Sequence, residues 1–379
     1  MKRELVIETG EAADRIALLE DGDLAEAYLE LRRHPSQVEG IYRGRVAGKT
    51  AGGDGFVEFG EGSTGFLNGR DLPTGSPALR EGQRLVVQVE RDSFPGKLAR
   101  LTARPRIAGC LAVFQPDGET VRAPRSLRDH PGIETLIDAV DGSLLGEEGV
   151  VLRTRAADAG ADAVVDEVRR LRDAWSSIRD MEDDTVLSPP VSPVESFIRD
   201  FPAGDWSQIV VTGGAVPFVR SCIDRWAPEA ADRLAAHHRT AGPFDGMGLE
   251  DAWQAAFEPL VRLPSGGELV IEPTQALVAI DVNAGNAGQG PLQVNLEAAA
   301  AAAREIRLRN LSGQAVIDFI SLSRGEDRNQ VLRRLRERCA ADRSVFVHGY
   351  SKLGLVELTR RRRRRSLPEA RALLEAEEG

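Results

Sequence analysis

Two short apolar runs that each end in an aspartate constrain the fold of this chain most strongly. The first extends from Leu277 to Asp281 and the second from Ala315 to Asp318, with a helix-like stretch between them. A strand, helix, strand unit pairs most readily as right-handed parallel neighbours, with the strands about 5 Å apart. Both carboxylates then lie at the carboxyl edge of the sheet, where open α/β sheets bind ligands. The pattern predicts a shared Mg²⁺ site, with Asn283 as a nearby hydrogen-bonding group.

A strand-terminal aspartate also has a purely structural interpretation. Such residues commonly cap the next helix or close a turn. The aspartate pair alone therefore leaves both interpretations open, and the rest of the chain has to decide between them.

Composition limits the class of protein. A chain of 379 residues with 42% apolar residues is long enough for two to four domains with ordinary cores. Its three cysteines, Cys110, Cys222 and Cys339, form no Cys-x-x-Cys pair, so we expect neither a disulfide framework nor a zinc knuckle. The amino terminus has no long apolar core, and no stretch approaches ~20 apolar residues. We expect a cytoplasmic protein without a membrane span.

The distribution of charge matters more than its sum. A net charge of −10 argues against a nucleic-acid binder that is basic over its whole surface. Basic residues nevertheless cluster at 42–45, 100–106 and 360–365. We expect the last cluster, six consecutive arginines, to extend a helix end, where the helix dipole favours cations. Solvated structural charges and RNA contacts are both compatible with that position.

The amino-terminal part has the pattern of β-structure. Residues 5–7 and 15–19 are predicted strands, followed by a turn at 20–23 and further alternation to Leu31. Between about residues 40 and 101, five short β-type runs separated by glycine predict a small barrel. Phe56 and Phe66 either stack nucleic-acid bases on the surface of this barrel or fill its core.

Helical and linker patterns follow. Apolar residues recur every three or four positions from Ala161 to Arg179, which predicts a helix whose stripe faces a core. The prolines of residues 188–193 exclude regular structure and predict a domain boundary. Beyond residue 263 we expect an α/β pattern, with helices at about 292–309 and 329–339 and a strand at 345–347.

Six ordered segments of the carboxyl-terminal part resemble the catalytic core of the ribonuclease E/G family. They are residues 263–267, 275–283, 295–299, 307–309, 316–320 and 352–360. The resemblance extends to residues 41–44, 65–67, 80–83 and 152–154 of the amino-terminal half.

The resemblance implies an α/β multidomain fold. We expect a discontinuous RNase H-like domain (1–37 plus 191–256), an inserted OB-fold RNA-binding barrel (38–103) and a 5′-sensor domain (104–190). A DNase I-like catalytic domain (257–366) and a carboxyl-terminal tail (367–379) would follow. The implied activity is Mg²⁺-dependent endonucleolytic cleavage of single-stranded RNA, AU-rich by expectation, in RNA processing or decay. Products would carry 5′-phosphate and 3′-hydroxyl ends, and a 5′ monophosphate would stimulate cleavage.

The resemblance also assigns roles to single residues. Asp281 and Asp318 match the family's Mg²⁺ ligands, and Asn283 matches the residue that hydrogen-bonds near the scissile phosphate. The expected RNA-binding residues of the barrel are Phe56, Phe66, Arg91 and Lys97. The expected 5′-phosphate sensor consists of Gly109, Val113, Arg153 and Thr154, in which a guanidinium beside a hydroxyl suits a terminal phosphate.

Some family features have no counterpart in this sequence. No Cys-Pro-x-Cys segment follows Leu367, so we expect no zinc, and a homo-oligomer stays open. We likewise expect no scaffold tail for degradosome partners. The family's Ser-Ala-Arg run after Asn283 is replaced by residues 284–290. That change keeps an alternative open, a single-stranded RNA-binding protein that does not cleave. A phosphatase or DNA nuclease using the same aspartates is a third alternative.

Overall fold

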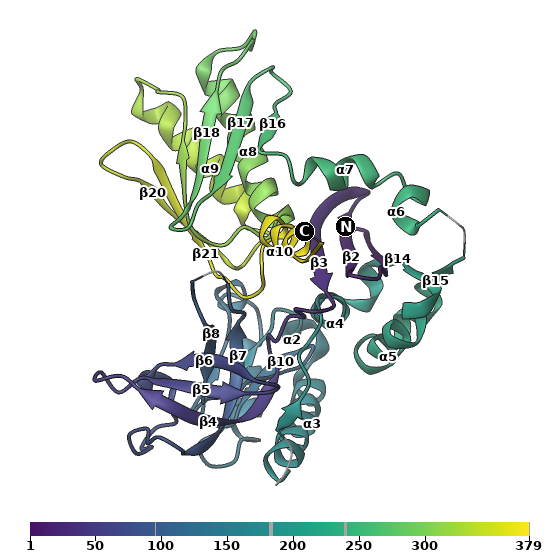
Figure 1. Ribbon diagram of the computed structural model, residues 1–379, viewed down its shortest axis with the longest axis vertical. Coiled ribbons are helices and arrows are strands. Elements are labelled where there is room, and N and C mark those ends of the chain that lie inside the picture. Colours follow the sequence, from purple (N-terminus) through teal and green to yellow (C-terminus); the bar gives the residue numbers. More distant parts are fainter. Residues whose placement is uncertain (95, 182–184, 239–240, 379) are drawn as a thin grey trace. The chain divides into compact units, whose positions relative to one another are not determined.

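The computed structural model describes residues 1–94, 96–181, 185–238 and 241–378 (Figure 1). Its chain forms two compact units, each of which is described here by itself. Unit 1 comprises Met1–Pro35, Asp205–Pro217 and Arg233–Gly379, and unit 2 comprises Ser36–Gly204 and Phe218–Asp232. The division into four domains stays a prediction.

The first sheet of unit 1 confirms the predicted amino-terminal strands. Its order is β15-β14-β1-β2-β3, and the turn between β2 and β3 places Asp21 and Gly22 at positive φ. Two successive residues at positive φ are typical of a tight hairpin turn that matches the twist of the strands. The strands are β1 (Arg3–Glu8), β2 (Ala13–Glu20), β3 (Asp23–Leu31), β14 (Trp206–Thr212) and β15 (Leu234–His237).

Three helices accompany this sheet: α6 (Pro243–Gly246), α7 (Glu250–Ala255) and α10 (Leu367–Glu378). The segment that the sequence analysis treats as a tail is helix α10. Its first residue, Leu367, is buried in one core cluster with Val6 of β1 and with Leu308, the last residue of helix α8 (Pro291–Leu308). Burial of these apolar side chains holds the end of the chain in unit 1.

The second sheet of unit 1 contains the aspartate strands. Its order is β16-β17-β18-β19-β21-β20, and only the central pair, β18 and β19, is parallel. The alanine-rich helix α8 connects these two strands, and α8 and α9 cover one face (Figure 1). The elements are β16 (Leu260–Arg262), β17 (Glu268–Pro273), β18 (Val278–Asn283), α8 (Pro291–Leu308), β19 (Gly313–Asp318), α9 (Gly325–Cys339), β20 (Val345–Tyr350) and β21 (Val356–Arg360).

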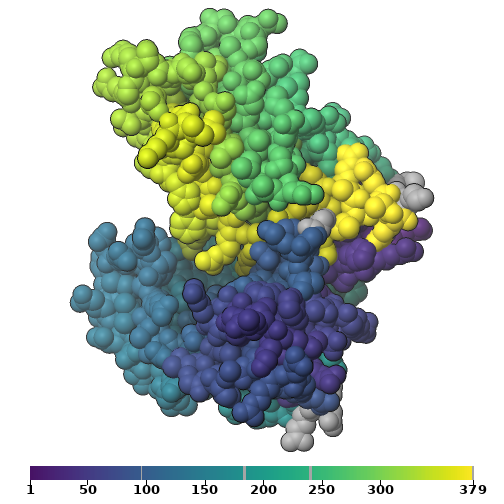
Figure 2. All heavy atoms as spheres, turned by 60° about the vertical axis from the view of Figure 1, so that its left-hand side comes forward, coloured from purple at the N-terminus to yellow at the C-terminus, as the bar shows by residue number. Residues whose placement is uncertain are grey.

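The prediction of a helix end at the arginine run is wrong. Arg360 closes strand β21, and residues 361–366 form no helix. The Arg360 side chain is buried, where it donates to Asp342 at 2.6 Å and to Asn310. Side chains alternate between faces in Val356–Arg360, which places this arginine toward the protein interior. The first arginine of the run therefore belongs to the folded core. Figure 2 shows the carboxyl-terminal residues in yellow beside the green residues of the sheet.

Unit 2 contains the predicted barrel. Strands β4, β5, β6, β8 and β7 pair in that order, and a further pairing of β4 with β7 closes the barrel (Figure 1). Strand β13 adds to the outside of β4. The strands are β4 (Ile41–Lys49), β5 (Gly55–Phe59), β6 (Ser63–Leu67), β7 (Arg84–Arg91), β8 (Ala99–Thr102) and β13 (Val186–Ser188).

A second, smaller sheet of unit 2 has the order β11-β12-β10-β9. Its core is filled from α1 and from α3, which spans the predicted residues and buries Val164, Val168 and Leu171. Among the described residues, no helix is long and apolar enough to cross a membrane. The elements of this sheet and its core are β9 (Ile107–Ala108), β10 (Ala112–Gln115), β11 (Val121–Arg122), α1 (Ile133–Asp141), β12 (Gly149–Leu152), α2 (Ala156–Ala159) and α3 (Ala161–Arg179). Helix α4 (Pro193–Asp200) also belongs to unit 2, and helix α5 (Val216–Trp226) has its first two residues in unit 1 and the others in unit 2.

Candidate active site

Asp281 and Asp318 are direct partners in the parallel register of β18 and β19. The preceding residues, Ile280 and Ile317, are buried beneath α8 and α9, whereas both aspartates are exposed. Because successive side chains of a strand alternate between faces, the two carboxylates leave the sheet on the side opposite the helices. The sequence pattern thus brings two negative charges together at one edge of the sheet.

Asn283 lies two residues beyond Asp281 and therefore shares its face. Its Nδ2 donates to Oδ2 of Asp281 at 2.9 Å. This bond orients one carboxylate and leaves the amide oxygen of Asn283 available to a ligand. The three predicted catalytic residues are therefore adjacent, although their catalytic roles stay predictions.

Asn295 is a site residue whose role the sequence analysis did not foresee. It is fully buried in α8, where Nδ2 donates to the Ile320 carbonyl at 2.7 Å and Oδ1 accepts from the Ile320 amide at 3.0 Å. This two-way bond fixes the chain two residues after Asp318. A polar residue in an alanine-rich helix is the signal that would have identified it, because a buried amide needs partners.

A second link holds the loop before β17. Glu297 of α8 accepts from the Ser265 amide at 2.9 Å. Burial acts to raise the pKa of Glu297, but hydrogen bonds from Ser265 and Gln293 outweigh it and lower the pKa below its usual value. Helix α8 thus braces the segments on both sides of the aspartate strands.

The donor set suits a hard divalent cation. Two neighbouring carboxylates supply anionic oxygen, which is the ligand type that Mg²⁺ takes, and the cation usually keeps several waters or phosphate oxygens. Within the described residues no group of three or more His, Cys, Asp or Glu side chains is placed to hold a metal. Asp281 and Asp318 would therefore hold Mg²⁺ with most of its coordination sphere open to water and substrate.

The barrel presents its predicted aromatic residues on the outside. Phe56 and Phe66 pair across β5 and β6, with ring centroids 5.9 Å apart in an edge-to-face arrangement. Phe56 is 37% exposed, whereas its neighbours Gly55 and Val57 are buried. The Arg100 guanidinium lies over the Phe66 ring at 5.6 Å. The alternative in which both phenylalanines fill the barrel core is wrong, because the pleat directs them outward.

Arg91 and Lys97 lie over the ring of a different aromatic residue, Phe94. The Arg91 guanidinium lies 5.0 Å from the Phe94 ring centroid, and the Lys97 ammonium lies 5.3 Å from it. Phe94 and Lys97 form an isolated antiparallel bridge. Phe94 was not a candidate from the sequence, although it stands between two predicted cations.

The four predicted sensor residues lie at one end of the smaller sheet. Strand β10 begins where its antiparallel partner β12 ends, so Gly109 and Val113 lie near Arg153 and Thr154. The Arg153 amide donates to the Leu111 carbonyl at 2.7 Å, which joins the two segments. The Thr154 hydroxyl lies 3.3 Å from that of Ser126.

An ion pair orients Arg153. Its Nη1 donates to Asp200 at 2.6 Å, and Asp200 also accepts from Arg199 at 2.8 Å. Burial acts to raise the pKa of Asp200, but attraction and hydrogen bonds from Arg199 and Arg153 hold the pKa below its usual value. A fixed guanidinium beside a hydroxyl can bind a phosphate monoester, although this role stays a prediction.

Glu167, which the sequence analysis did not identify, binds the loop that contains the predicted sensor residue Gly109. Its carboxylate is buried and accepts from the amides of Cys110, Leu111 and Ala112 at 2.9, 2.7 and 2.8 Å. A Cβ at Gly109 would lie 2.6 Å from this carboxyl group, which explains the glycine. Glu167 therefore determines the path of the predicted sensor loop.

Comparison with known proteins identifies the relatives of this chain. The profile of the Ribonuclease E/G family matches residues 106–363. Ribonuclease G of Haemophilus influenzae is 30% identical over 96% of this chain and 80% of its own length. Ribonuclease G of Escherichia coli is 28% identical over 97% of this chain and 81% of its own length. Ribonuclease E of Escherichia coli is 28% identical over 98% of this chain, which spans 38% of that longer protein.

Proposed function

We propose that this chain, which belongs to the ribonuclease E/G family, is a Mg²⁺-dependent endoribonuclease that cleaves single-stranded RNA. As a homologue of ribonucleases G and E, the chain is related to hydrolases that cut RNA internally. The observation that carries the finer proposal is the in-register pair Asp281 and Asp318 on one exposed sheet edge. In the described part of the chain neither carboxylate forms an ion pair, and two adjacent carboxylates without a cation are unfavourable.

Each residue of the site would have a separate role in phosphodiester hydrolysis. When bound, Mg²⁺ would supply an activated water and would neutralise charge on the phosphate. Asp281 and Asp318 would hold the cation, and the amide oxygen of Asn283 would accept a hydrogen bond beside the reacting phosphate. Asn295 positions the segment after Asp318 without contacting substrate. Attack of water on phosphorus with departure of the 3′ oxygen gives 5′-phosphate and 3′-hydroxyl ends.

Substrate selection belongs to the barrel and the sensor. Phe56 and Phe66 offer rings on which exposed bases stack, which favours single strands over duplexes. Arg153 and Thr154 offer a guanidinium and a hydroxyl to a 5′ monophosphate. We propose AU-rich RNA as substrate and RNA processing or decay as the process, because single-stranded segments rich in A and U pair weakly.

The test is a cleavage assay with a matched variant. Purified protein is incubated with a short 5′-monophosphorylated, AU-rich RNA, with and without Mg²⁺, and the products are resolved by size. Wild-type protein should give internal cuts only with Mg²⁺, and Asp281→Asn should give none. Glu272→Gln removes an exposed carboxylate from the neighbouring strand β17 and should cut normally.

Two outcomes would overturn the proposal. Normal cutting by Asp281→Asn would remove the metal assignment, whereas tight RNA binding without cuts in any condition would indicate a non-catalytic RNA-binding protein. Equal cutting of DNA with the same sequence would indicate a less specific nuclease.

A further inference from the structure

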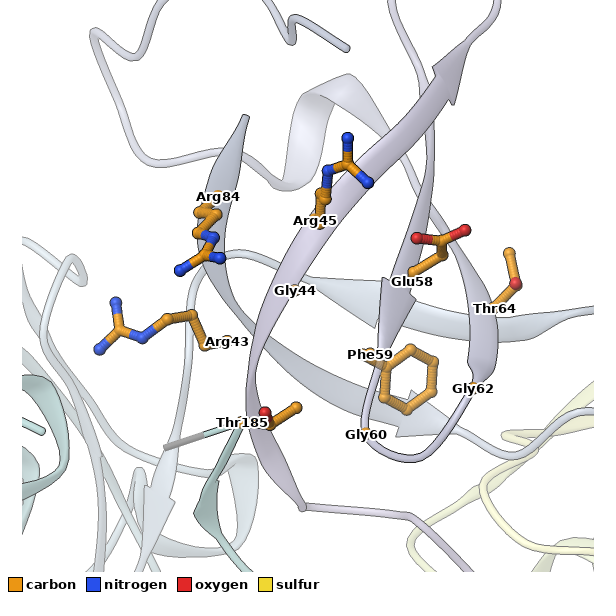
Figure 3. A pocket seen from close by; sticks show the side chains of 10 residues that line it. All are labelled: Arg43, Gly44, Arg45, Glu58, Phe59, Gly60, Gly62, Thr64, Arg84 and Thr185. Atoms are coloured by element: carbon orange, nitrogen blue, oxygen red, sulfur yellow. The ribbon is translucent and has the colours of Figure 1, made fainter. Parts of the chain in front are cut away.

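A row of polar side chains crosses four strands on the outer face of the barrel. In register, Arg84 of β7 lies opposite Arg45 of β4, Arg45 opposite Glu58 of β5, and Glu58 opposite Thr64 of β6. Arg43 lies two residues before Arg45 and shares its face. Figure 3 shows these side chains around a pocket of about 390 Å³. All of them belong to unit 2.

The charges of this pocket do not balance. Arg45 and Arg84 face each other directly in an antiparallel pair, an arrangement that destabilises a sheet. Among the described lining residues Glu58 is the one carboxylate, and neither Arg45 nor Arg84 forms an ion pair with it. Among the described residues that line the pocket, three guanidinium groups therefore share this face with a single carboxylate, an excess of positive charge that an anionic ligand would offset.

Arg43 completes the positive edge of the pocket. Its Nη2 donates to the carbonyl of Met181, which fixes the direction of the side chain. Its Nε is buried and has no hydrogen-bond partner in the described part of the chain. Planar guanidinium groups match phosphate oxygens in particular.

The row of polar side chains lies next to the exposed aromatic pair on the same face of the barrel. Phe56 lies two residues before Glu58 on the same face of β5, so the two rows are about 7 Å apart. The second row consists of Phe56, Phe66 and Arg100, which are also in register. Rings beside a line of cations are the combination by which single-stranded nucleic acid is bound, with bases on the rings and backbone on the charges.

We propose that Arg43, Arg45 and Arg84 form a binding site for backbone phosphates of the RNA strand whose bases stack on Phe56 and Phe66. This inference rests on the proposed function, because it takes RNA as the ligand. The site is separate from the predicted sensor: it contacts internal phosphates and has no requirement for a 5′ end. It lengthens the RNA-binding surface of the barrel by one row of side chains.

The test compares two double variants that lose the same charge. Arg45→Gln with Arg84→Gln removes the exposed part of the pocket and retains Arg43. Arg80→Gln with Arg170→Gln removes two exposed arginines of unit 2 that lie outside it. Binding of a fluorescent 5′-hydroxyl oligouridylate of twelve nucleotides is measured by anisotropy in EDTA over a range of salt concentrations. Steady-state cleavage of a longer RNA in Mg²⁺ is measured with the same preparations.

The pocket variant should bind more weakly, and the slope of log affinity against log salt should fall by about 1.4, because each phosphate contact on a single strand contributes about 0.7. Its KM should rise at least about fivefold while kcat stays unchanged. Lysines at both positions should restore the salt slope but only part of the affinity, because lysine cannot bond a phosphate bidentately. The control variant should match wild type.

Three results would overturn the inference. An unchanged salt slope and KM in the pocket variant, with wild-type cleavage intact, would reject the phosphate site alone. If uridine monophosphate or inorganic phosphate binds wild type but not the pocket variant while RNA binding is unaffected, the pocket serves a small anion. A wild-type protein that neither binds nor cleaves RNA would reject the proposed function itself.

Discussion

Replacing Glu167 with glutamine should loosen the loop of residues 109–112 without a change in side-chain shape. The wild-type carboxylate is 6% exposed and accepts three backbone amides, one through Oε1 and two through Oε2. A glutamine has one acceptor oxygen, and its amide nitrogen would face a donor. The least costly orientation keeps the oxygen toward Leu111 and Ala112 and leaves Cys110 without an acceptor.

The size of the effect follows from these bonds. A buried donor without an acceptor costs about 1 to 3 kcal/mol. The lower value, about 1 kcal/mol, applies here because Cys110 is only partly buried. Replacing a charged acceptor by a neutral one weakens each of the other two bonds by about 1 kcal/mol. The loop should therefore lose about 3 kcal/mol, which is roughly a hundredfold increase in local opening.

Amide hydrogen exchange followed by mass spectrometry measures that opening directly. Peptides that cover residues 109–113 should exchange roughly a hundredfold faster in Glu167→Gln, whereas barrel peptides should be unchanged. Asp166→Asn on the preceding position is the control, because the Asp166 and Arg169 side chains are each 61% exposed and such pairs contribute little. Less than threefold faster exchange in Glu167→Gln would refute the view that this carboxylate holds the loop.

Three further outcomes are expected. Arg153→Ala should slow cleavage of 5′-monophosphorylated RNA and spare 5′-hydroxyl RNA; equal slowing of both would reject the sensor assignment. Asn295→Leu should lower kcat with KM little changed, because Ile320 loses both bonds; unchanged kcat would refute its positioning role. The pKa of Asp200 is lowered, so its stabilisation exists above the unfolded value of about 3.9 and disappears as pH falls through the lower folded pKa. The melting temperatures of wild type and Asp200→Asn should therefore differ at pH 6 and converge as the pH falls below the folded-state pKa of Asp200.

Local patterns were sufficient for several regular elements of this fold, although not for helix α10 or for the end of strand β21. The apolar spacing of residues 161–179 predicted helix α3, and the glycine-separated β runs predicted the barrel. The two aspartate strands were also predicted to be parallel neighbours. Each of these predictions depends on side-chain periodicity, and periodicity is a property of the sequence itself.

The features that the sequence analysis missed depend on contacts between distant segments. Glu167 lies in a helix whose pattern only shows that it is charged, and its partners are more than fifty positions away. Arg360 was assigned to a helix end, where the helix dipole favours cations, yet it is buried in a strand and bonds to Asp342 and Asn310. A partner supplied by the fold reverses the usual preference of a charged side chain, and composition does not record it.

The parallel register of β18 and β19 is what makes the candidate metal site possible. Shifting one strand by a single residue would turn Asp281 or Asp318 toward the helices and expose the adjacent isoleucine. The core against α8 and α9 opposes that shift, because Ile280 and Ile317 are both nearly fully buried there. The two carboxylates repel each other, which disfavours this register. Burial of the apolar side chains on the other face of the same strands outweighs that repulsion. The apolar core on the helix-covered face thus fixes the register of the two strands, and the register brings the two carboxylates together on the opposite face.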